Sequence, residues 1–321
     1  MQKIGIIGGA GYTGGELLRL LLNHPEAEIM FVNSQSQAGK YLHEVHQDLL
    51  GETELRFTDT VDKDIDVLFA CAGHGKTKLF LSENAFPDRL KIIDLSRDFR
   101  LKAEDHDFVY GLPELQRETI QQSKHIANPG CFATCIQLAL LPLAAAGELN
   151  SEVHVHAITG STGAGQKPVP TTHFSWRNNN LSIYKAFQHQ HLGEIGQSLQ
   201  QLQADFSHSI NFLPLRGDFA RGIYASVYLD SALSANAATA LYESYYADHP
   251  FTHLSLSNPH LKQVVNTNKA IVHVQKIDGK LLIISMIDNL LKGASGQAVQ
   301  NFNLMSGYDE TTGLHLKAMA F

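Results

Sequence analysis

The first 33 residues constrain the fold most, because they hold an apolar run, a glycine turn, a helix pattern and a second apolar run. Residues 3–7 and 28–32 each predict a short buried strand. Between them, residues 8–14 read GGAGYTG, and a helix pattern starts at Glu16. In this context the turn predicts dinucleotide binding, because glycines let a pyrophosphate approach the helix N-terminus. The alternative is a purely structural glycine turn in another kind of α/β protein.

The glycine spacing and the second strand bear on which dinucleotide binds. Gly8, Gly11 and Gly14 do not follow the G-x-G-x-x-G pattern of NAD-dependent dehydrogenases. About twenty residues on, where a carboxylate would bind a ribose 2′-hydroxyl, residues 33–36 read NSQS. No carboxylate stands there to repel a 2′-phosphate, so the sequence favours NADP over NAD.

Further apolar runs extend the first half of the chain. Residues 66–71 and 91–95 predict strands with a helical stretch between them, which is typical of a parallel, doubly wound sheet. Gly73 and His74 follow the first of these strands, at a carboxyl end where such sheets bind ligands. Residues 94–100 are rich in charge, and they form either a solvated loop or a site where Arg97 and Arg100 bind an anion.

The second half has a different pattern. Strand-like alternation indicates an α+β domain with a mixed or antiparallel sheet covered on one face. Residues 160–165 read GSTGAG and predict a flexible loop near its start. The strand-like runs are residues 152–158, 223–229, 270–274 and 280–287.

Length and composition exclude several classes of protein. A chain of 321 residues suggests two domains. The net charge of −7 offers no basic surface for nucleic acid or an anionic membrane. We find no signal peptide, and the apolar run at 132–146 is too short to cross a bilayer. Three cysteines form no disulfide framework, so we expect a cytoplasmic protein.

Cys131 stands where turn residues 128–130 (Asn-Pro-Gly) give way to an apolar helix pattern. Unpaired N–H groups and the helix dipole favour a thiolate at such a position. A small apolar residue that opens a buried helix would produce the same pattern.

The chain has seventeen histidines, and one cluster stands out at His189, His191 and Glu194. On a helix the two imidazoles would point about 200° apart and could not share an ion. No further ligands follow zinc spacing, so we expect no metal. One of the histidines instead pairs with Cys131 as acid/base, with Glu194 orienting the ring or contacting substrate; the alternative is a polar helix start.

A nucleotide-binding domain followed by a thiolate suggests nicotinamide chemistry on a thioester, as in aldehyde-forming reductases and aldehyde dehydrogenases. At this level of detail the chain resembles the N-acetyl-gamma-glutamyl-phosphate reductases over essentially its whole length. The glycine turn is widely shared, whereas residues 110–114 and 288–301 are specific. The segments that carry the resemblance are 8–14, 94–100, 110–114, 128–131, 189–194 and 288–301.

The resemblance implies an enzyme of arginine biosynthesis that uses NADPH to reduce an N-acylated glutamyl 5-phosphate to the semialdehyde. It makes Cys131 the nucleophile and His189 the acid/base residue, although His191 stays open for that role. Substrate contacts are expected from Arg100, Asn128, His191 and Glu194. Cofactor contacts are expected from Gly8, Gly11, Tyr12, Thr13, Gly14, Ser34, Ser36, Gly73, Gly163 and Asn289.

The resemblance also implies a glyceraldehyde-3-phosphate dehydrogenase-like fold: an α/β Rossmann-like domain plus an α+β domain with a mixed sheet. Residues 1–130 with 292–321 would bind NADP, and residues 131–291 would provide catalysis and a homodimer or homotetramer interface. Residues 288–300 would close over the nucleotide. Aspartate-semialdehyde dehydrogenase and a non-catalytic nucleotide-binding protein remain alternatives, and an acetyl or a succinyl substrate remains open.

Overall fold

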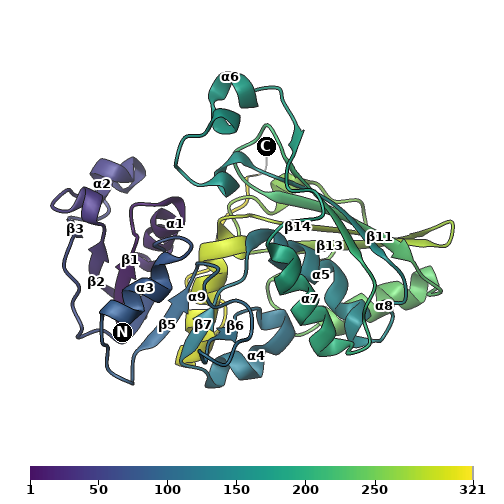
Figure 1. Cartoon of the computed structure of the whole chain (residues 1–321), viewed down its shortest axis with the longest axis horizontal. Coiled ribbons are helices and arrows are strands. Elements are labelled where there is room, and N and C mark those ends of the chain that lie inside the picture. Colours follow the sequence, from purple (N-terminus) through teal and green to yellow (C-terminus); the bar gives the residue numbers. More distant parts are fainter. Residues whose placement is uncertain (320–321) are drawn as a thin grey trace. The chain divides into compact units, whose positions relative to one another are not determined.

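The computed structural model describes residues 1–319 of the chain. The chain divides into two compact units. Unit 1 comprises Met1–Pro129 and Ala294–His315, and unit 2 comprises Gly130–Gly293 and the residues from Leu316 onward. The expected Rossmann-like and α+β halves are both present, as the sheets of the two units show (Figure 1).

Unit 1 is built on a fully parallel sheet in the order β3-β2-β1-β4-β5-β7-β6. Its strands are β1 (Gln2–Ile7), β2 (Ala27–Asn33), β3 (Phe57–Thr58), β4 (Val67–Ala70), β5 (Lys91–Asp94), β6 (Val109–Tyr110) and β7 (His125–Ala127). Its helices are α1 (Tyr12–Leu21), η1 (Gln35–Gln37), α2 (Leu42–Val45), η2 (Gln47–Leu49), α3 (Lys76–Glu83), α4 (Pro113–Gln122) and α9 (Gly296–Ser306).

The start of unit 1 follows directly from its residues. Ile4, Ile6 and Ile7 of β1 are buried, as expected of a central parallel strand. Helix α1 begins at Tyr12 rather than Glu16, so the end of the glycine turn is already the first helical turn. The C-terminal helix α9 packs against α1 and α4 and so completes this unit.

Unit 2 has a mixed sheet in the order β12-β13-β14-β11-β8-β10-β9, in which β8–β10 and β12–β13 pair in parallel. Its strands are β8 (Val153–Thr159), β9 (Ser182–Ile183), β10 (Ile210–Arg216), β11 (Ile223–Asp230), β12 (Thr252–Leu254), β13 (Ala270–Ile277) and β14 (Lys280–Ile287). Its helices are α5 (Cys131–Ala145), η3 (Ser161–Ala164), η4 (Pro170–Thr172), α6 (Phe174–Arg177), α7 (His191–Leu202), α8 (Ala235–Tyr246) and η5 (Leu261–Gln263). A π-helix, η6 (Leu291–Ser295), precedes α9.

Helix α5 is the centre of unit 2. It packs against the helices α7 and α8 and against the strands β11, β13 and β14, which explains why nearly all of its residues are buried and apolar. Across residues 1–319, no helix is long and apolar enough to cross a membrane.

One segment that carries the resemblance joins two elements, and one local expectation differs from the structure. In residues 110–114, Tyr110 ends β6 and Pro113 begins α4, where a proline is well placed because its missing N–H is not needed. The glycine-rich stretch 160–165 forms η3 and is tied down, because Ser161 N and Thr162 N donate to the carbonyls of Phe219 and Ala220.

Candidate active site

Cys131 is the first residue of α5, as the sequence predicts. The N-cap, Gly130, has extended backbone, and no side chain caps the helix start. The backbone N–H groups of the first turn therefore surround the half-buried cysteine. Such a position favours the thiolate form.

The other two cysteines lie in unreactive surroundings. Cys135 is fully buried, and its Sγ donates to the carbonyl of Ser285 at 3.2 Å. Burial raises the pKa of the Cys135 thiol to about 12, and it does the same for Cys71. Neither thiol ionises near neutral pH, which leaves Cys131 as the candidate nucleophile.

The two histidines lie side by side at the entry to α7. His191 is the first residue of that helix, and His189 precedes it in non-helical chain. The helical case, in which the two rings would point about 200° apart, does not apply, because α7 includes only His191. The ring centroids are 4.5 Å apart, and both rings contact Phe132, the residue after Cys131.

His189 is buried and neutral near pH 7. Burial lowers its pKa to about 4, with a further lowering from Lys185 and an opposing effect of Glu194. The backbone N–H of His191 donates to Nδ1 of His189 at 3.3 Å. A neutral ring that accepts at Nδ1 carries its proton on Nε2, so Nε2–H is the donor that this histidine can offer.

Glu194 connects the histidine cluster to the turn before Cys131. Its Oε2 accepts from the Gly130 N–H at 2.9 Å, and its Oε1 lies 3.9 Å from Nε2 of His191. Because all these groups are buried, the carboxylate fixes the backbone that presents the thiol. Glu194 therefore ties the start of α7, where His191 lies, to the turn that precedes Cys131.

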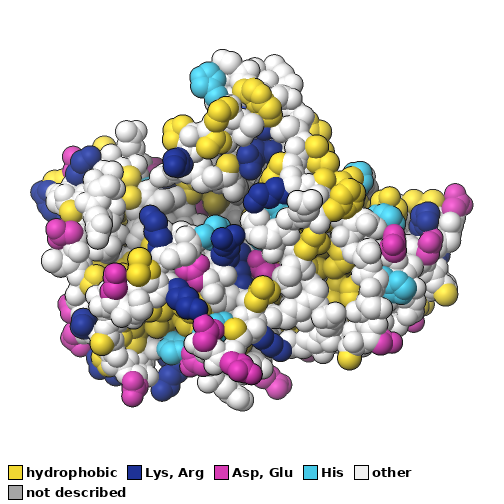
Figure 2. Space-filling model, viewed as in Figure 1, with side chains coloured by type: hydrophobic (Ala, Val, Ile, Leu, Met, Phe, Trp, Pro, Cys, Tyr) yellow, Lys and Arg dark blue, Asp and Glu magenta, His cyan; other side chains and the backbone are white. Residues whose placement is uncertain are grey.

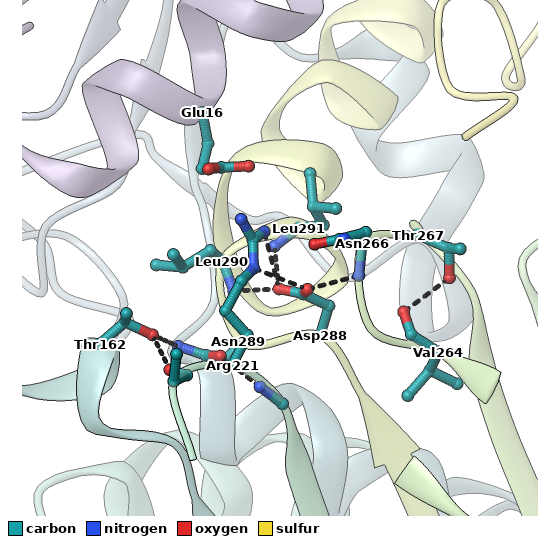
Figure 3. A network of polar contacts seen from close by, with 12 residues as sticks. Glu16, Thr162, Arg221, Val264, Asn266, Thr267, Asp288, Asn289, Leu290 and Leu291 are labelled. Carbon is teal, nitrogen blue, oxygen red and sulfur yellow. Dashed lines mark hydrogen bonds and ion pairs between the residues drawn. The ribbon is translucent and has the colours of Figure 1, made fainter. Parts of the chain in front are cut away.

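A second polar network lies where β14 ends (Figure 3). The buried carboxylate of Asp288 accepts from Nε and Nη2 of Arg221 at 3.0 and 3.2 Å, and from the Asn266 N–H at 2.8 Å. It also accepts from the N–H groups of Leu290 and Leu291. This bidentate pair fixes the turn that follows β14.

Asn289 joins that turn to the glycine-rich segment. Its Oδ1 accepts from the Gly222 N–H at 2.7 Å, and its Nδ2 donates to Thr162 Oγ1 at 3.0 Å. Gly163 is the next residue along, in η3. The structure therefore brings together the two candidate cofactor positions of unit 2, Gly163 and Asn289.

Gly293 shows how closely this turn passes Cys131. A Cβ atom on Gly293 would lie 2.8 Å from Cβ of Cys131 and 3.2 Å from the carbonyl oxygen of Asp288. Real side chains do not approach so closely, so only glycine fits without movement of a neighbour.

In unit 1 the candidate cofactor residues form a cradle at the carboxyl end of β1. Gly8 has a positive φ of 72°, and a Cβ on Gly14 would lie 2.5 Å from the carbonyl oxygen of Gly9. Gly11 is the N-cap residue of α1, and no side chain accepts a hydrogen bond from the start of this helix. Tyr12 and Thr13 lie in its first turn. An uncapped helix start in a tight glycine turn fits a pyrophosphate. Ser295 Oγ also donates to the carbonyl of Thr13 at 2.9 Å.

The other cofactor candidates follow neighbouring strands. Ser34 and Ser36 come directly after β2, and no carboxylate lies between Asn33 and Lys40. Gly73 follows β4 with a positive φ of 91°. These residues fit a dinucleotide whose ribose carries a 2′-phosphate.

Arg100 and Asn128 are both buried, and their hydrogen bonds reach backbone and side-chain groups of the same unit. Arg100 donates from Nε to the carbonyl of Asn128 at 2.9 Å and from Nη2 to the carbonyl of Leu95 at 3.1 Å. Asn128 donates from Nδ2 to the carbonyl of Ala294 and accepts from Asn301 at Oδ1. Arg100 thus holds the backbone three residues before Cys131, and its predicted contact with substrate phosphate stays a prediction.

Sequence reasoning missed several residues around this site, notably Tyr184, Arg216, Arg221 and Gly293. Arg221 and Asp288 are 67 residues apart in the chain, so no local pattern links them. Gly293 lies within residues 288–301, which are specific to the family resemblance, and this was the one sequence signal for any of these four residues. Within residues 1–319, no group of three or more His, Cys, Asp or Glu residues is arranged to hold a metal ion.

Comparison with known proteins agrees with this geometry. Residues 3–123 match a family model described as semialdehyde dehydrogenase, NAD binding domain, and residues 131–289 match semialdehyde dehydrogenase, dimerisation domain. In fold, the chain is similar to aspartate semialdehyde dehydrogenase II of Vibrio cholerae, with a TM-score of 0.75 at 18% identity over 96% of this chain and 98% of that one. A Candida albicans aspartate semialdehyde dehydrogenase solved with NADP has a TM-score of 0.69 at 13% identity, covering 95% and 99% of the two chains.

Relatives with much higher sequence identity are named as a different enzyme. The chain is 62% identical to N-acetyl-gamma-glutamyl-phosphate reductase of Parabacteroides distasonis and 61% identical to that of Bacteroides thetaiotaomicron, in both cases over 100% of each chain. The aspartate enzymes are thus distant relatives that share the fold. The chain belongs to the N-acetyl-gamma-glutamyl-phosphate reductase family of oxidoreductases.

Proposed function

We propose that this chain catalyses the NADPH-dependent reduction of N-acetyl-γ-glutamyl phosphate to the 5-semialdehyde, with Cys131 as nucleophile and His189 as acid/base residue. The observation that carries the proposal is the placement of Cys131 at an uncapped helix start, beside a buried histidine pair and a carboxylate that fixes the preceding turn. Family membership supplies the reaction class.

The thiolate of Cys131 attacks the acyl carbon of the substrate. The bond from that carbon to the phosphate oxygen breaks, inorganic phosphate leaves, and a thioester remains on Sγ. Bound NADPH supplies the hydride that reduces this carbonyl. The carbon–sulfur bond then breaks, which releases the aldehyde and returns the thiolate.

His189 handles the charge on the substrate oxygen. Negative charge develops there in both tetrahedral states, and a hydrogen bond from Nε2–H stabilises it. The same nitrogen shares its proton with this oxygen while the charge is present, and it keeps that proton as the charge returns to sulfur and the aldehyde forms, so no imidazolate is produced. His191 and Glu194 keep the ring and the helix start in place. Substrate contacts of Arg100, Asn128, His191 and Glu194 belong to this proposal.

The proposed cofactor is NADPH rather than NADH, supported by the missing carboxylate after β2. Residues 1–130 with 292–321 would bind it, and residues 131–291 would carry the chemistry. Asn33→Asp should lower kcat/KM for NADPH and raise it for NADH, whereas Gln35→Arg should favour NADPH further. Unchanged ratios in both variants would contradict this choice of cofactor.

We also propose a homo-oligomer, a dimer or tetramer, formed through residues 131–291. The support is a family match described as a dimerisation domain and a set of exposed apolar side chains around α6 (Figure 2). The most exposed of them is Phe174, at 78%. The others include Trp176, Leu181, Ile183 and Phe187. Light scattering should give a multiple of the 35.4 kDa chain mass, reduced by Phe174→Glu if this surface takes part.

A cytoplasmic location is part of the proposal as well. All three cysteines are free thiols, as expected in a reducing compartment. The substrates are phosphorylated small molecules that are made inside cells.

The function is tested with a panel of acyl phosphates and NADPH. We expect NADPH consumption and phosphate release with acetylated or succinylated glutamyl phosphate, and far less with aspartyl phosphate. Cys131→Ser should abolish turnover, while Cys135→Ser serves as a matched control on the same helix. Higher activity on aspartyl phosphate would favour an aspartate-semialdehyde dehydrogenase, and NADPH binding without any turnover would favour a nucleotide-binding protein.

A further inference from the structure

Arg216 is a cation near the nucleophile that the mechanism above does not use. It is the last residue of β10, and its guanidinium carbon lies 4.7 Å from the ring centroid of Tyr184. Its Nε is buried, and in the described part of the chain this atom has no hydrogen-bond partner. The residue as a whole is partly buried, and a buried donor atom without an acceptor costs free energy unless a ligand supplies one.

Within residues 1–319, no Asp or Glu side chain forms an ion pair with the Arg216 guanidinium. The nearest acid in sequence, Asp218, accepts from the Asn179 N–H at 2.6 Å. Arg177, which is buried, donates from Nη1 to the backbone carbonyl of Arg216 at 2.6 Å. Burial and repulsion from the Arg216 guanidinium lower the pKa of Arg177, against an opposing effect of Asp218, so the two cations lie near enough to interact. Such a pair favours an anion from outside the chain.

Arg177 itself is occupied by the surrounding loop. Its other donors reach the carbonyls of Thr171 and Asn180 and the hydroxyl of Ser182. Arg177 thus builds the loop from 171 to 182, and Arg216 is left with a donor to offer.

A short series of contacts leads from Arg216 to the nucleophile. The Tyr184 ring that it covers lies 5.9 Å from the His189 ring, and His189 lies 5.5 Å from Phe132, next to Cys131. Burial and the nearby Cys131 sulfur raise the pKa of Tyr184 to about 12, against the lowering effect of the Arg216 charge and of a hydrogen bond from Arg216. The aromatic ring of Tyr184 therefore lies between the Arg216 guanidinium and the His189 ring.

We propose that Arg216 binds a carboxylate of the substrate and so helps to determine which acyl phosphates react. This inference rests on the proposed function, whose substrate carries a carboxylate on its α-carbon. That carboxylate lies roughly 5 Å from the reacting carbon in an extended chain, with carbon–carbon bonds of about 1.5 Å. A succinylated substrate would add a second carboxylate on its acyl group. The fork of Nε and Nη atoms suits either carboxylate.

The test runs the reaction in reverse, because semialdehyde and inorganic phosphate then have separate KM values. Arg216→Met removes the positive charge. Arg216→Lys keeps the charge but loses the paired Nε and Nη donors of the guanidinium. We expect KM for the semialdehyde to rise about 10- to 100-fold in Arg216→Met, with KM for phosphate and for NADP unchanged. Arg216→Lys should recover part of the loss, and Lys262→Met is the control for an exposed cation of the same unit.

Comparing acetylated with succinylated semialdehyde identifies the source of the carboxylate. An equal loss on both assigns Arg216 to the α-carboxylate, and a loss on the succinylated compound alone assigns it to the acyl group. A rise only in KM for phosphate, or no change in a folded Arg216→Met enzyme, would overturn the inference. Inactivity of the unaltered enzyme on both compounds would instead reject the proposed function.

Discussion

At the scale of single residues, burial decides the chemistry of the site. His189 is 5% exposed and has its pKa lowered to about 4, mainly by burial. Cys131 keeps partial exposure, whereas Cys135, one helical turn further along, is fully buried. Residues of the same type within a few positions thus have opposite roles, and their place relative to the core explains the difference.

The lowered pKa of His189 predicts an acid-dependent loss of stability. Between its ordinary pKa of 6.5 and about 4, the unfolded chain binds a proton that the folded His189 does not. The free energy of unfolding should therefore fall as the pH is lowered through this range, by on the order of 2 kcal/mol from this residue. Urea unfolding at pH 7 and pH 4.5 measures how much the free energy of unfolding falls between these two pH values. This decrease should be smaller in His189→Gln than in the unaltered protein. His208→Gln, at an exposed position, should behave like the unaltered protein, and an identical loss in all three would contradict the assignment.

Gly293 provides a second test at a single position. Its replacement by alanine places a Cβ 2.8 Å from that of Cys131, so the nucleophile has to move. We expect kcat to fall by about 10- to 100-fold with NADPH binding retained. The matched control is Gly196→Ala in α7, where a Cβ meets no atom within 4 Å; there kcat should stay unchanged and stability should rise by up to about 1 kcal/mol. Full activity in Gly293→Ala would show that the turn is not so close to Cys131.

At the scale of elements, α5 both presents Cys131, the proposed nucleophile, and anchors unit 2. Pro142 lies inside this helix and has no N–H to donate to the carbonyl of Leu138, four residues before it. The hydroxyl of Tyr246, from α8, donates to that carbonyl instead. A neighbouring tyrosine, Tyr242, donates to the carbonyl of Ala139. The helix that carries Cys131 is therefore completed by a side chain 108 residues away.

A double-mutant cycle tests this substitute hydrogen bond. Tyr246→Phe should lower the free energy of unfolding by about 1–3 kcal/mol, because it leaves a buried carbonyl without its donor. In a Pro142→Ala background the backbone N–H can serve Leu138, so the same change should cost less. Tyr242→Phe is the control, with equal cost in both backgrounds. Equal costs for Tyr246→Phe would argue against compensation between proline and tyrosine.

At the scale of the whole molecule, local patterns predicted the elements better than the contacts between them. The N-terminal strand, glycine turn and helix, and the helix start at Cys131, were predictable because each depends on residues close in sequence. The bonds from Glu194 to Gly130 and from Arg221 to Asp288 join residues 64 and 67 positions apart. They depend on how strands and helices pack, which periodicity does not encode. The orientation of His189 and His191 could not be predicted for the same reason, since it required knowing where α7 begins.

The central claim is a covalent thioester on Cys131, and intact-protein mass spectrometry tests it most directly. Without NADPH, the acyl phosphate should add one acyl group to each chain and release an equal amount of phosphate. Peptide mapping should place the acyl group on Cys131, with the adduct kept in Cys135→Ser and absent in Cys131→Ser. Phosphate release without an adduct, or an adduct on another residue, would contradict the claim.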